Sequence, residues 1–296
     1  MEKILRDKKA IVLFVAPAFI LFIAVLFVPI CQAIFYSMCK TEDLVRKFVF
    51  LDNYKELLFE DERMLIALKN SLFFMVFSVL SQLVIGMLMA ALLSNLKVGK
   101  NFFKNVYYLP CVLSSAALGL MWMFIFNNRF GINVILAKMG IPGPDWLMDD
   151  KGFIILPMWV IAFVALWQYM GQSMMLYMAQ ISGIDKSLYE AAYIDGANKL
   201  KAFRYVTMPL IRPMVATAMS LNCIGSLKFF DLIYAMETPD ANPGHLTEVL
   251  ATHLYTKGFR HHRYEYASTI GMVLLILCLV VTLLINKFVR VKEEEL

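Results

Sequence analysis

The chain has 296 residues, of which 60% are hydrophobic and only 17% are charged. Soluble domains are usually about 45–50% apolar, and the mean hydropathy here is +0.66, so a soluble fold would lack polar residues for its surface. The formal net charge of +5 is distributed between apolar segments and does not form the basic stripe of a nucleic-acid-binding protein. Composition therefore indicates a protein embedded in a lipid bilayer, with no nucleic-acid partner.

Six stretches are apolar over the roughly 20 residues that a helix needs to cross a membrane. Backbone groups in lipid must bond one another, and these long runs lack the alternation of barrel strands. We therefore expect an all-α polytopic membrane protein, with six transmembrane helices in a single domain, 1–296. The first stretch is longer than the ~7–15 apolar residues of a signal peptide and is expected to be retained. The expected spans cover about 10–36, 66–95, 107–127, 152–183, 209–230 and 264–288.

Lysine and arginine counts beside the spans predict the orientation, because cytoplasmic loops are enriched in them. Basic residues precede the first span, follow the last, and occupy the loops at 97–104 and 186–204. The first two loops on the opposite side are rich in Asp and Glu. Both termini are therefore expected to be cytoplasmic. The last outer loop fits less well, because Lys257, Arg260 and Arg263 lie near the sixth span.

The sequence shows no ligand set for a metal or cofactor. Five cysteines are scattered without a CxxC pair, and the four histidines lie in the last outer loop with no carboxylate or cysteine beside them to complete a site. The phosphate-binding pattern GxxxxGK[ST] is absent. We also find no convergent acids and bases at membrane depth, so an enzyme is disfavoured and any ATP chemistry must belong to other subunits.

The fourth and fifth spans are joined by a cytoplasmic loop, 184–208, with clear helix signals. Asp185 is placed to cap a short helix and Gly196 to end it in a left-handed conformation. Asn198 can cap a second short helix, and Pro209 can open the fifth span. On the first helix, Ile184, Leu188, Ala191 and Ala192 are predicted to share one face. Such a helix pair suits a lever that fits a groove in a partner; the alternative is an amphipathic connector on the lipid surface.

The loop also carries an extended motif. Glu190-Ala191-Ala192, Asp195-Gly196-Ala197, Phe203, Pro209 and Pro213 resemble the "EAA" loop of binding-protein-dependent ABC importer permeases. Further segments narrow the resemblance to the maltose-permease-like group of sugar importers. The one visible departure is at 237–244, where that group has a glycine-rich turn. The further matching segments are Leu51-Asp52-Asn53-Tyr54, Ala67–Ser71, Leu109-Pro110 with Trp122, Phe130–Asn133, Phe230–Tyr234 and Thr247-Glu248.

This resemblance implies a division of labour. The chain and a second, homologous permease would form the pore as a heterodimer in the bacterial plasma (inner) membrane, two ATPase subunits would hydrolyse ATP, and an extracellular binding protein would deliver a sugar. In that family the loop is seated in a cleft of the ATPase subunit, so this chain itself would bind no cofactor. The residues implied in coupling are Glu190, Ala191, Ala192, Asp195, Gly196, Ala197, Phe203 and Pro209.

Polar and aromatic side chains inside the spans are candidates for the substrate path, since such residues tend to face a cavity or a partner. Amide groups and aromatic faces suit a sugar; the alternative for each residue is a hydrogen bond between helices. An ABC permease for another solute, or a secondary transporter, stays open, although the latter would need charged coupling residues that these spans almost entirely lack. The candidates are Gln82, Trp167, Gln168, Tyr169, Gln172 and Asn222.

Overall fold

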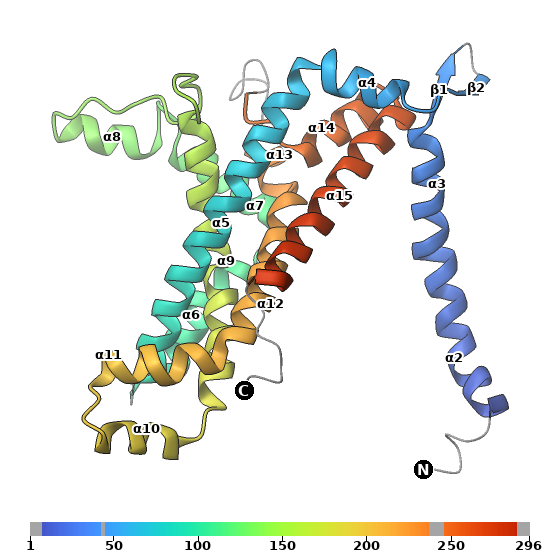
Figure 1. The fold of residues 1–296 in the computed structure, drawn as a ribbon. Helices are drawn as coiled ribbons and strands as arrows, with labels where there is room; N and C mark the ends of the chain where they lie inside the picture. Colours follow the sequence, from blue (N-terminus) through green and yellow to red (C-terminus); the bar gives the residue numbers. More distant parts are fainter. Residues whose placement is uncertain (1–7, 43–44, 97, 237–245, 289–296) are drawn as a thin grey trace. The chain divides into compact units, whose positions relative to one another are not determined.

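The computed structural model describes residues 8–42, 45–96, 98–236 and 246–288. These residues are mostly helical (Figure 1), in agreement with the sequence, apart from one short β-hairpin. In chain order the elements are α2 (Lys8–Phe22), η1 (Ile23–Phe27), α3 (Val28–Ser37), β1 (Cys39–Glu42), β2 (Val45–Phe48), α4 (Asp52–Phe59), α5 (Glu62–Ser94), α6 (Lys100–Val112), α7 (Ser115–Ile125), α8 (Gly131–Lys138), α9 (Leu156–Ser182), α10 (Lys186–Ile194), α11 (Lys199–Ala202), η2 (Phe203–Thr207), α12 (Met208–Leu227), α13 (Asp231–Met236), α14 (Leu250–Tyr255), η3 (Thr256–Arg260) and α15 (Tyr264–Phe288).

The chain divides into two compact units. Unit 1 comprises residues 1–62 and 253–275, and unit 2 comprises residues 63–252 and 276–296. The boundary falls inside α14 and again inside α15. A single transmembrane domain for the whole chain stays a prediction.

Unit 1 begins with a long apolar helical run, Val12–Ser37, none of whose most apolar window is buried against protein. The β-hairpin that follows was not expected; it pairs β1 and β2 antiparallel, from Cys39↔Phe48 to Glu42↔Val45. A buried amide from α4 secures the junction between helix and hairpin, because Asn53 Nδ2 donates to the carbonyls of Ser37 and Cys39 at 3.0 and 2.6 Å.

The start of α15 ties this hairpin and α4 together by polar contacts. Glu265 accepts hydrogen bonds from Thr41 Oγ1 at 2.7 Å and from Arg46 Nε at 3.1 Å. Two residues earlier, Arg263 donates to Glu56 at 2.7 Å. Unit 1 therefore relies on charged contacts between segments more than 200 residues apart, which no local sequence pattern indicates.

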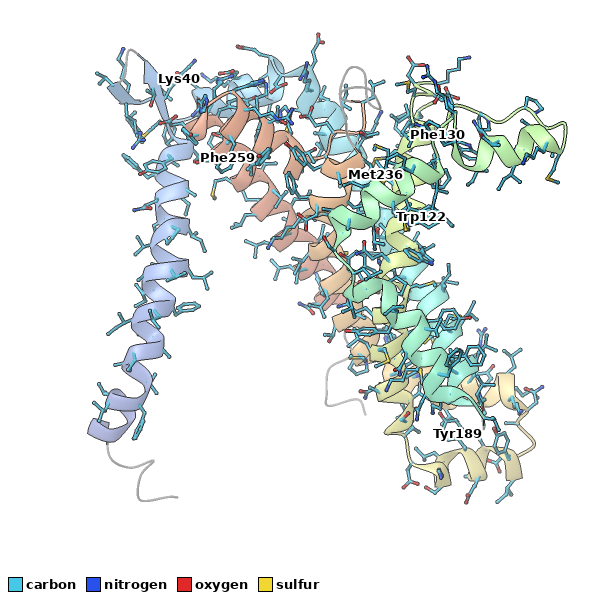
Figure 2. The ribbon with its side chains drawn as sticks, turned by 180° about the vertical axis from the view of Figure 1, so that it is seen from behind. Lys40, Trp122, Phe130, Tyr189, Met236 and Phe259 are labelled. Carbon is cyan, nitrogen blue, oxygen red and sulfur yellow. The ribbon has the colours of Figure 1, made fainter. Side chains whose placement is uncertain are left out.

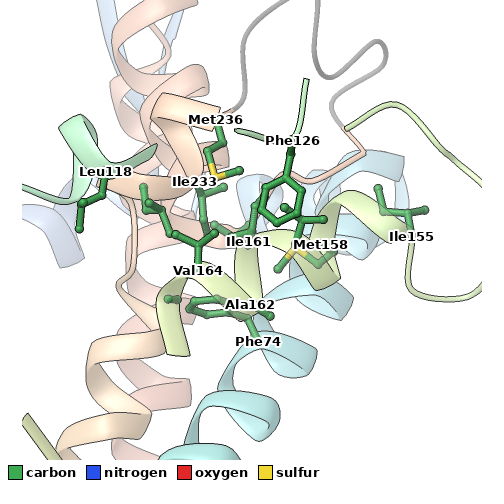
Figure 3. Packing of buried hydrophobic residues seen from close by; sticks show 14 residues of the cluster. Phe74, Leu118, Phe126, Ile155, Met158, Ile161, Ala162, Val164, Ile233 and Met236 are labelled. Carbon is green, nitrogen blue, oxygen red and sulfur yellow. The ribbon is translucent and has the colours of Figure 1, made fainter. Parts of the chain in front are cut away.

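Unit 2 is built on α5, α9 and α12, whose facing sides form its hydrophobic core. Figure 3 shows one buried cluster, in which Phe74 of α5, Leu118 of α7, Ile161 of α9 and Ile233 of α13 take part. A second cluster joins the other halves of α5, α9 and α12 through residues that include Met87, Met174, Tyr177 and Ile211. The three long helices are thus held together over most of their length.

Four helical runs of the described residues are long and apolar enough to cross a membrane. They correspond to the expected first, second, fifth and sixth spans, but the fifth is longer than expected, because the helix already begins at Lys199. The expected six-span count and the cytoplasmic termini stay predictions. The four runs are Val12–Ser37, Glu62–Ser94, Lys199–Met236 and Tyr264–Lys287.

The expected third span, 107–127, is not one straight helix. It is replaced by α6 and α7, which meet at an angle of 95°. Leu113 between them is extended (φ −76°, ψ 150°), and Pro110 lies in the last turn of α6. A proline lacks the N–H that continues a helix, so α6 ends soon after it. Together, α6 and α7 count as a membrane span only if they are taken as one broken helix.

The expected fourth span corresponds to α9, which has 27 residues, about 40 Å at 1.5 Å per residue. It is long enough to cross a bilayer but is not among the runs that are apolar enough. Gln168 and Gln172 in its middle lower its hydropathy. The polar centre of α9 lies within a helix that packs against the rest of unit 2 along its length, since both clusters described above include it.

Candidate functional site

The predicted coupling loop forms a hairpin of helices at one end of unit 2 (Figure 1). We call residues 184–207, which include α10, α11 and η2, the hairpin. Figure 2 shows Tyr189 of α10 at this end and Phe130, just before α8, at the other. The turn between α5 and α6 also lies here, because Asn95 and Lys100 line one cavity together with α10. Two loops that the positive charges predict to be cytoplasmic therefore lie on the same side.

The two ends of α10 are set by local hydrogen bonds that the sequence predicts. The Asp185 side chain accepts from the Ser187 amide at 2.9 Å and caps the helix start. At the other end Gly196 has φ +81°; its amide donates to the Tyr193 carbonyl at 3.1 Å, and the Ala197 amide to the Ala192 carbonyl at 2.9 Å. This is the pair of bonds of a Schellman motif, which needs a residue in the left-handed region.

The second half of the hairpin runs directly into α12. Asn198 caps α11 as predicted, accepting from the Lys201 amide at 2.9 Å. Pro209 lies in the first turn of α12, but the chain before it is already helical, with a π-helical turn at Phe203–Thr207. A π turn shifts the hydrogen-bond pattern by one residue, which accommodates the missing N–H of Pro209. Lys199–Met236 is therefore one continuous run.

The outward side of α10 carries apolar side chains. Leu188 and Ile194 are 45% and 86% exposed, and Glu190 and Ala191 are exposed as well. No residue of α10 is fully buried. The hairpin therefore exposes apolar side chains and the Glu190 carboxylate. Of the four residues expected to share a face, Leu188 and Ala191 are exposed and Ile184 and Ala192 are half-buried.

The inner side of α10 carries tyrosines instead. Tyr189 and Tyr193 line a cavity between α10 and the ends of the long helices. The Tyr189 hydroxyl is 2.9 Å from Thr207 Oγ1, and Thr207 is buried at the entrance to α12. This hydrogen bond links α10 directly to α12. Sequence reasoning missed Tyr189, which lies about 100° around the helix from Glu190 and is half-buried.

A second cavity, of about 250 Å³, lies between α5, α9 and α12. Four of the predicted substrate-path residues line it, together with aromatic rings and small residues. We call it the polar cavity. Its lining comprises Phe74, Ser78, Gln82, Ala165, Tyr169, Gln172, Leu221, Asn222, Gly225, Ser226 and Phe229.

Hydrogen bonds hold the amides of the polar cavity across three helices. Ser173 Oγ of α9 donates to Gln82 Oε1 of α5 at 3.0 Å and accepts from Asn222 Nδ2 of α12 at 3.4 Å. Gln172 is exposed, and within the described residues its side chain has one polar contact, with Cys111 Sγ, 3.8 Å from Gln172 Oε1. Gln172 is therefore the amide with the most capacity left to bind a ligand.

Aromatic rings form the other wall of the polar cavity. The rings of Phe74 and Phe229 are stacked, with centroids 5.2 Å apart and planes 9° apart. The Tyr169 ring meets Phe229 edge-on at 5.7 Å, and its hydroxyl is 3.0 Å from Ser115 Oγ. A ligand here would meet flat apolar faces on one side and amide groups on the other.

The two remaining predicted residues lie outside the polar cavity. Trp167 packs against Trp122 in the hydrophobic cluster, with ring centroids 5.4 Å apart. Gln168 is fully buried, and its Nε2 donates to the Leu113 carbonyl at 3.3 Å and to Ser115 Oγ at 3.0 Å. Leu113 lies at the break between α6 and α7, so Gln168 bonds a carbonyl that the break leaves free. Its position favours the interhelical alternative.

Comparison with known families decides what kind of protein this is. The model of the family described as "Binding-protein-dependent transport system inner membrane component" matches residues 82–291, more than two thirds of the chain. The chain belongs to this family. It is therefore a permease component of an ABC importer, a transport protein and not an enzyme.

Curated relatives agree with this assignment. The chain is 34% identical over 255 residues to the probable ABC transporter permease YurN of Bacillus subtilis, covering 84% of this chain and 85% of the relative. It is 30% identical to the arabinooligosaccharide transport permease AraP of the same organism (80% and 74% covered) and to the lactose transport permease LacF of Rhizobium radiobacter (77% and 76%).

Solved structures show that the fold is also shared. A chain of a bacterial ABC transporter that imports the acidic polysaccharide alginate matches with a TM-score of 0.82 over 98% of this permease and 97% of that chain, at 23% identity. A methionine ABC transporter matches more weakly, with a TM-score of 0.53 over 78% of this chain and 98% of that chain. At these identities the matches describe the fold alone.

Three of the four histidines of the last loop lie within the described residues. Within the described residues, no group of three or more His, Cys, Asp or Glu side chains could hold a metal ion; His245 and the departure at 237–244 lie outside them. His253 is fully buried instead, with Nε2 3.1 Å from Asp61 of unit 1.

Asp61 is the centre of this buried cluster. Tyr266 donates to its carboxylate at 2.7 Å, and Lys257 Nζ lies at 2.9 Å. Burial acts to raise the pKa of Asp61, but the hydrogen bonds from Lys257 and Tyr266 and the neighbouring His253 outweigh it, so the pKa lies well below its usual range. The carboxylate stays ionised and binds the loop before α5 to η3 and α15, which is a structural role.

Proposed function

We propose that this permease carries a sugar or an oligosaccharide. The observation that carries the proposal is the lining of the polar cavity, which combines the rings of Tyr169 and Phe229 with the amides of Gln172 and Asn222. Sugars present apolar C–H faces that stack on aromatic rings and hydroxyls that bond amides; sites of this kind combine an apolar wall with a few placed polar groups. The names of AraP and LacF, which transport arabinooligosaccharides and lactose, support the same cargo class.

We further propose that separate ATPase subunits drive transport through the hairpin. Its exposed surface combines the apolar side chains of Leu188 and Ile194 with the Glu190 carboxylate, and exposed apolar patches of this kind mark interaction sites. The capped ends of α10 and the bond between Tyr189 and Thr207 make the hairpin a stiff extension of α12. A push on α10 would then be transmitted into the helix that lines the polar cavity.

The proposed assembly contains a second, homologous permease, two ATPase subunits and an extracellular binding protein in the bacterial inner membrane. The family description, which names a binding-protein-dependent system and an inner membrane component, supports this. This chain would supply the pore and the coupling surface, and its partners would supply ATP hydrolysis and most of the cargo selectivity.

Reconstitution tests the proposal. Proteoliposomes would hold the permease with its second permease and ATPase subunits, with ATP inside and the binding protein and a labelled arabino-oligosaccharide or lactose outside. We expect uptake that requires ATP and survives an ionophore that collapses proton and sodium gradients. Uptake that requires such a gradient would overturn the ATP-driven mechanism. Competition by amino acids, with none by sugars, would overturn the cargo class.

A further inference from the structure

The cavity beneath α10 has a lining that the transport mechanism does not use. Its volume is about 430 Å³, within the roughly 300–1,000 Å³ of small-molecule sites. We call it the hairpin cavity. Residues from α5, α6, α9, α10 and the start of the Lys199–Met236 run contribute to it. Its charged lining residues are Lys100, Lys186 and Lys199, and no aspartate or glutamate lines it.

These three lysines are placed where their own helices disfavour them. Lys100 is the first residue of α6, Lys186 the first of α10, and Lys199 the first of the run that continues into α12. The helix dipole is positive at this end, so a cation there costs about 0.3–1 kcal/mol. Among the described residues, no ion pair is found for any of the three. An anion in the hairpin cavity would offset the unfavourable interaction between each of the three lysines and the positive end of its helix.

The uncharged lining supports the same ligand. Ser94 Oγ, at the end of α5, is buried and has no hydrogen-bond partner within the described part of the chain. A hydroxyl group can donate to an anionic oxygen. Tyr189, Tyr193 and Phe203 provide flat walls beside it, which leave room for a small organic group. Lysine is a common phosphate ligand, acting as a point charge.

We propose that the hairpin cavity binds a phosphate ester, held by Lys100, Lys186 and Lys199, with Ser94 as an additional donor. Two sources share this chemistry: the headgroup of an anionic phospholipid, and a free phosphorylated metabolite. The hairpin cavity touches both α10 and the helix that leads into α12, so its occupant contacts both parts of the proposed lever. The proposal goes beyond transport. It rests on the proposed function in one respect, which is that the hairpin cavity faces the cytoplasm.

The test compares two variants that lose the same charge. In the first, Lys100→Gln, Lys186→Gln and Lys199→Gln are combined; in the control, Lys104→Gln, Lys138→Gln and Lys151→Gln are combined, none of which lines the hairpin cavity. Each is purified as the full complex. Native mass spectrometry measures retention of phosphatidylglycerol over phosphatidylcholine. Equilibrium dialysis measures binding of radiolabelled glycerol 3-phosphate to the complex in phosphatidylcholine nanodiscs.

We expect the wild type and the control to bind in at least one of these assays. The triple cavity variant should bind at least about tenfold more weakly, because it loses the charge-assisted hydrogen bonds of all three lysines. Retention of phosphatidylglycerol alone identifies the ligand as a lipid headgroup, and binding of glycerol 3-phosphate alone identifies a soluble ester. Binding by the wild type in neither assay, or equal binding by the cavity variant, overturns the proposal.

A second variant covers the case in which the triple variant does not assemble. Ala91→Phe fills the hairpin cavity from α5 without removing a charge, and we expect it to lose binding. The combined Lys→Arg variant, which keeps the charge, should retain it. Undiminished binding by Ala91→Phe would contradict the proposed site. Neither assay needs ATP or cargo, so the result is independent of whether the permease transports a sugar.

Discussion

The hairpin and the polar cavity are organised in opposite ways, although both belong to unit 2. The hairpin is continuous in sequence, its helix ends are fixed by bonds within a few residues, and its motif residues Glu190, Ala191 and Asp195 are exposed. The polar cavity takes residues from α5, α9 and α12, which are separated by up to about half of the chain, and the Ser173 hydroxyl of α9 links the amides of Gln82 and Asn222.

This difference suggests how each region can fail. A surface substitution in the hairpin leaves the core untouched, so its effect should appear in the interaction with a partner and not in stability. In the polar cavity, packing and ligand contacts share the same helices, so stability and transport are expected to change together unless a side chain faces only the cavity. Each of the following substitutions is chosen to separate these two outcomes.

The largest effect is expected from Glu190→Lys. It reverses the charge of an exposed side chain on the hairpin. Disrupting a charged pair at an interface costs about 2–5 kcal/mol. We expect ATP-dependent uptake to fall about thirtyfold or more, with stimulation of ATP hydrolysis by the loaded binding protein lost as well. Both are measured in proteoliposomes at equal amounts of inserted permease.

The control is Asp150→Lys, the same kind of reversal in the exposed loop before α9, at the other end of unit 2. It should leave the coupling between uptake and hydrolysis unchanged. Normal uptake by Glu190→Lys at equal abundance would remove the lever interpretation of the hairpin.

Gly171→Ala should affect stability before transport. A Cβ at Gly171 would lie 2.1 Å from the Tyr107 carbonyl oxygen and 2.8 Å from Tyr108 Cα, so the backbones of α6 and α9 would have to separate. Overpacking of this kind costs about 1–3 kcal/mol. We expect a lower melting temperature and a smaller monodisperse peak in fluorescence-detected size exclusion. Gly225→Ala, where nothing lies within 4 Å, is the control, and equal melting of the two variants would argue against close packing of α6 and α9.

Gln172 and Gln168 lie four residues apart on α9 but should respond differently. Gln172→Leu removes an amide that faces the polar cavity, and one lost hydrogen bond of about 1 kcal/mol should raise the apparent KM for the loaded binding protein about fivefold at normal abundance. Gln168→Leu removes the donor to Leu113 at the helix break, and should lower the melting temperature instead. Gln180→Leu, which does not line the polar cavity, is the control for Gln172. The same phenotype for Gln172→Leu and Gln168→Leu would end this distinction.

The hairpin depends on local bonds and the polar cavity on contacts between distant segments. The sequence therefore predicts the hairpin better than it predicts the cavity. Asp185, Gly196 and Asn198 act through bonds to their near neighbours, so their roles could be read from the chain alone. The different roles of Gln172 and Gln168 could not be read from the chain, because they depend on where α6 breaks. A proline indicates a possible break, but the 95° bend is fixed by packing against α9. The contacts of His253 with Asp61 and of Glu265 with the β-hairpin likewise join segments about 200 residues apart, where no periodicity points from one to the other.

The smallest effect is expected at the end of α10. Gly196→Ala leaves ample space, since nothing lies within 4 Å of the added Cβ, but the residue has φ +81°. The left-handed conformation costs an L-residue about 1–2 kcal/mol, and the strain stays within the turn between α10 and α11. We expect uptake to fall less than about fivefold, with the melting temperature of the complex unchanged, because no core contact is altered. Gly196→Asn, which tolerates this conformation better, should retain more uptake than Gly196→Ala. A loss as large as that of Glu190→Lys would mean that the turn itself contacts the partner, and that Gly196 is needed for close approach and not for backbone geometry.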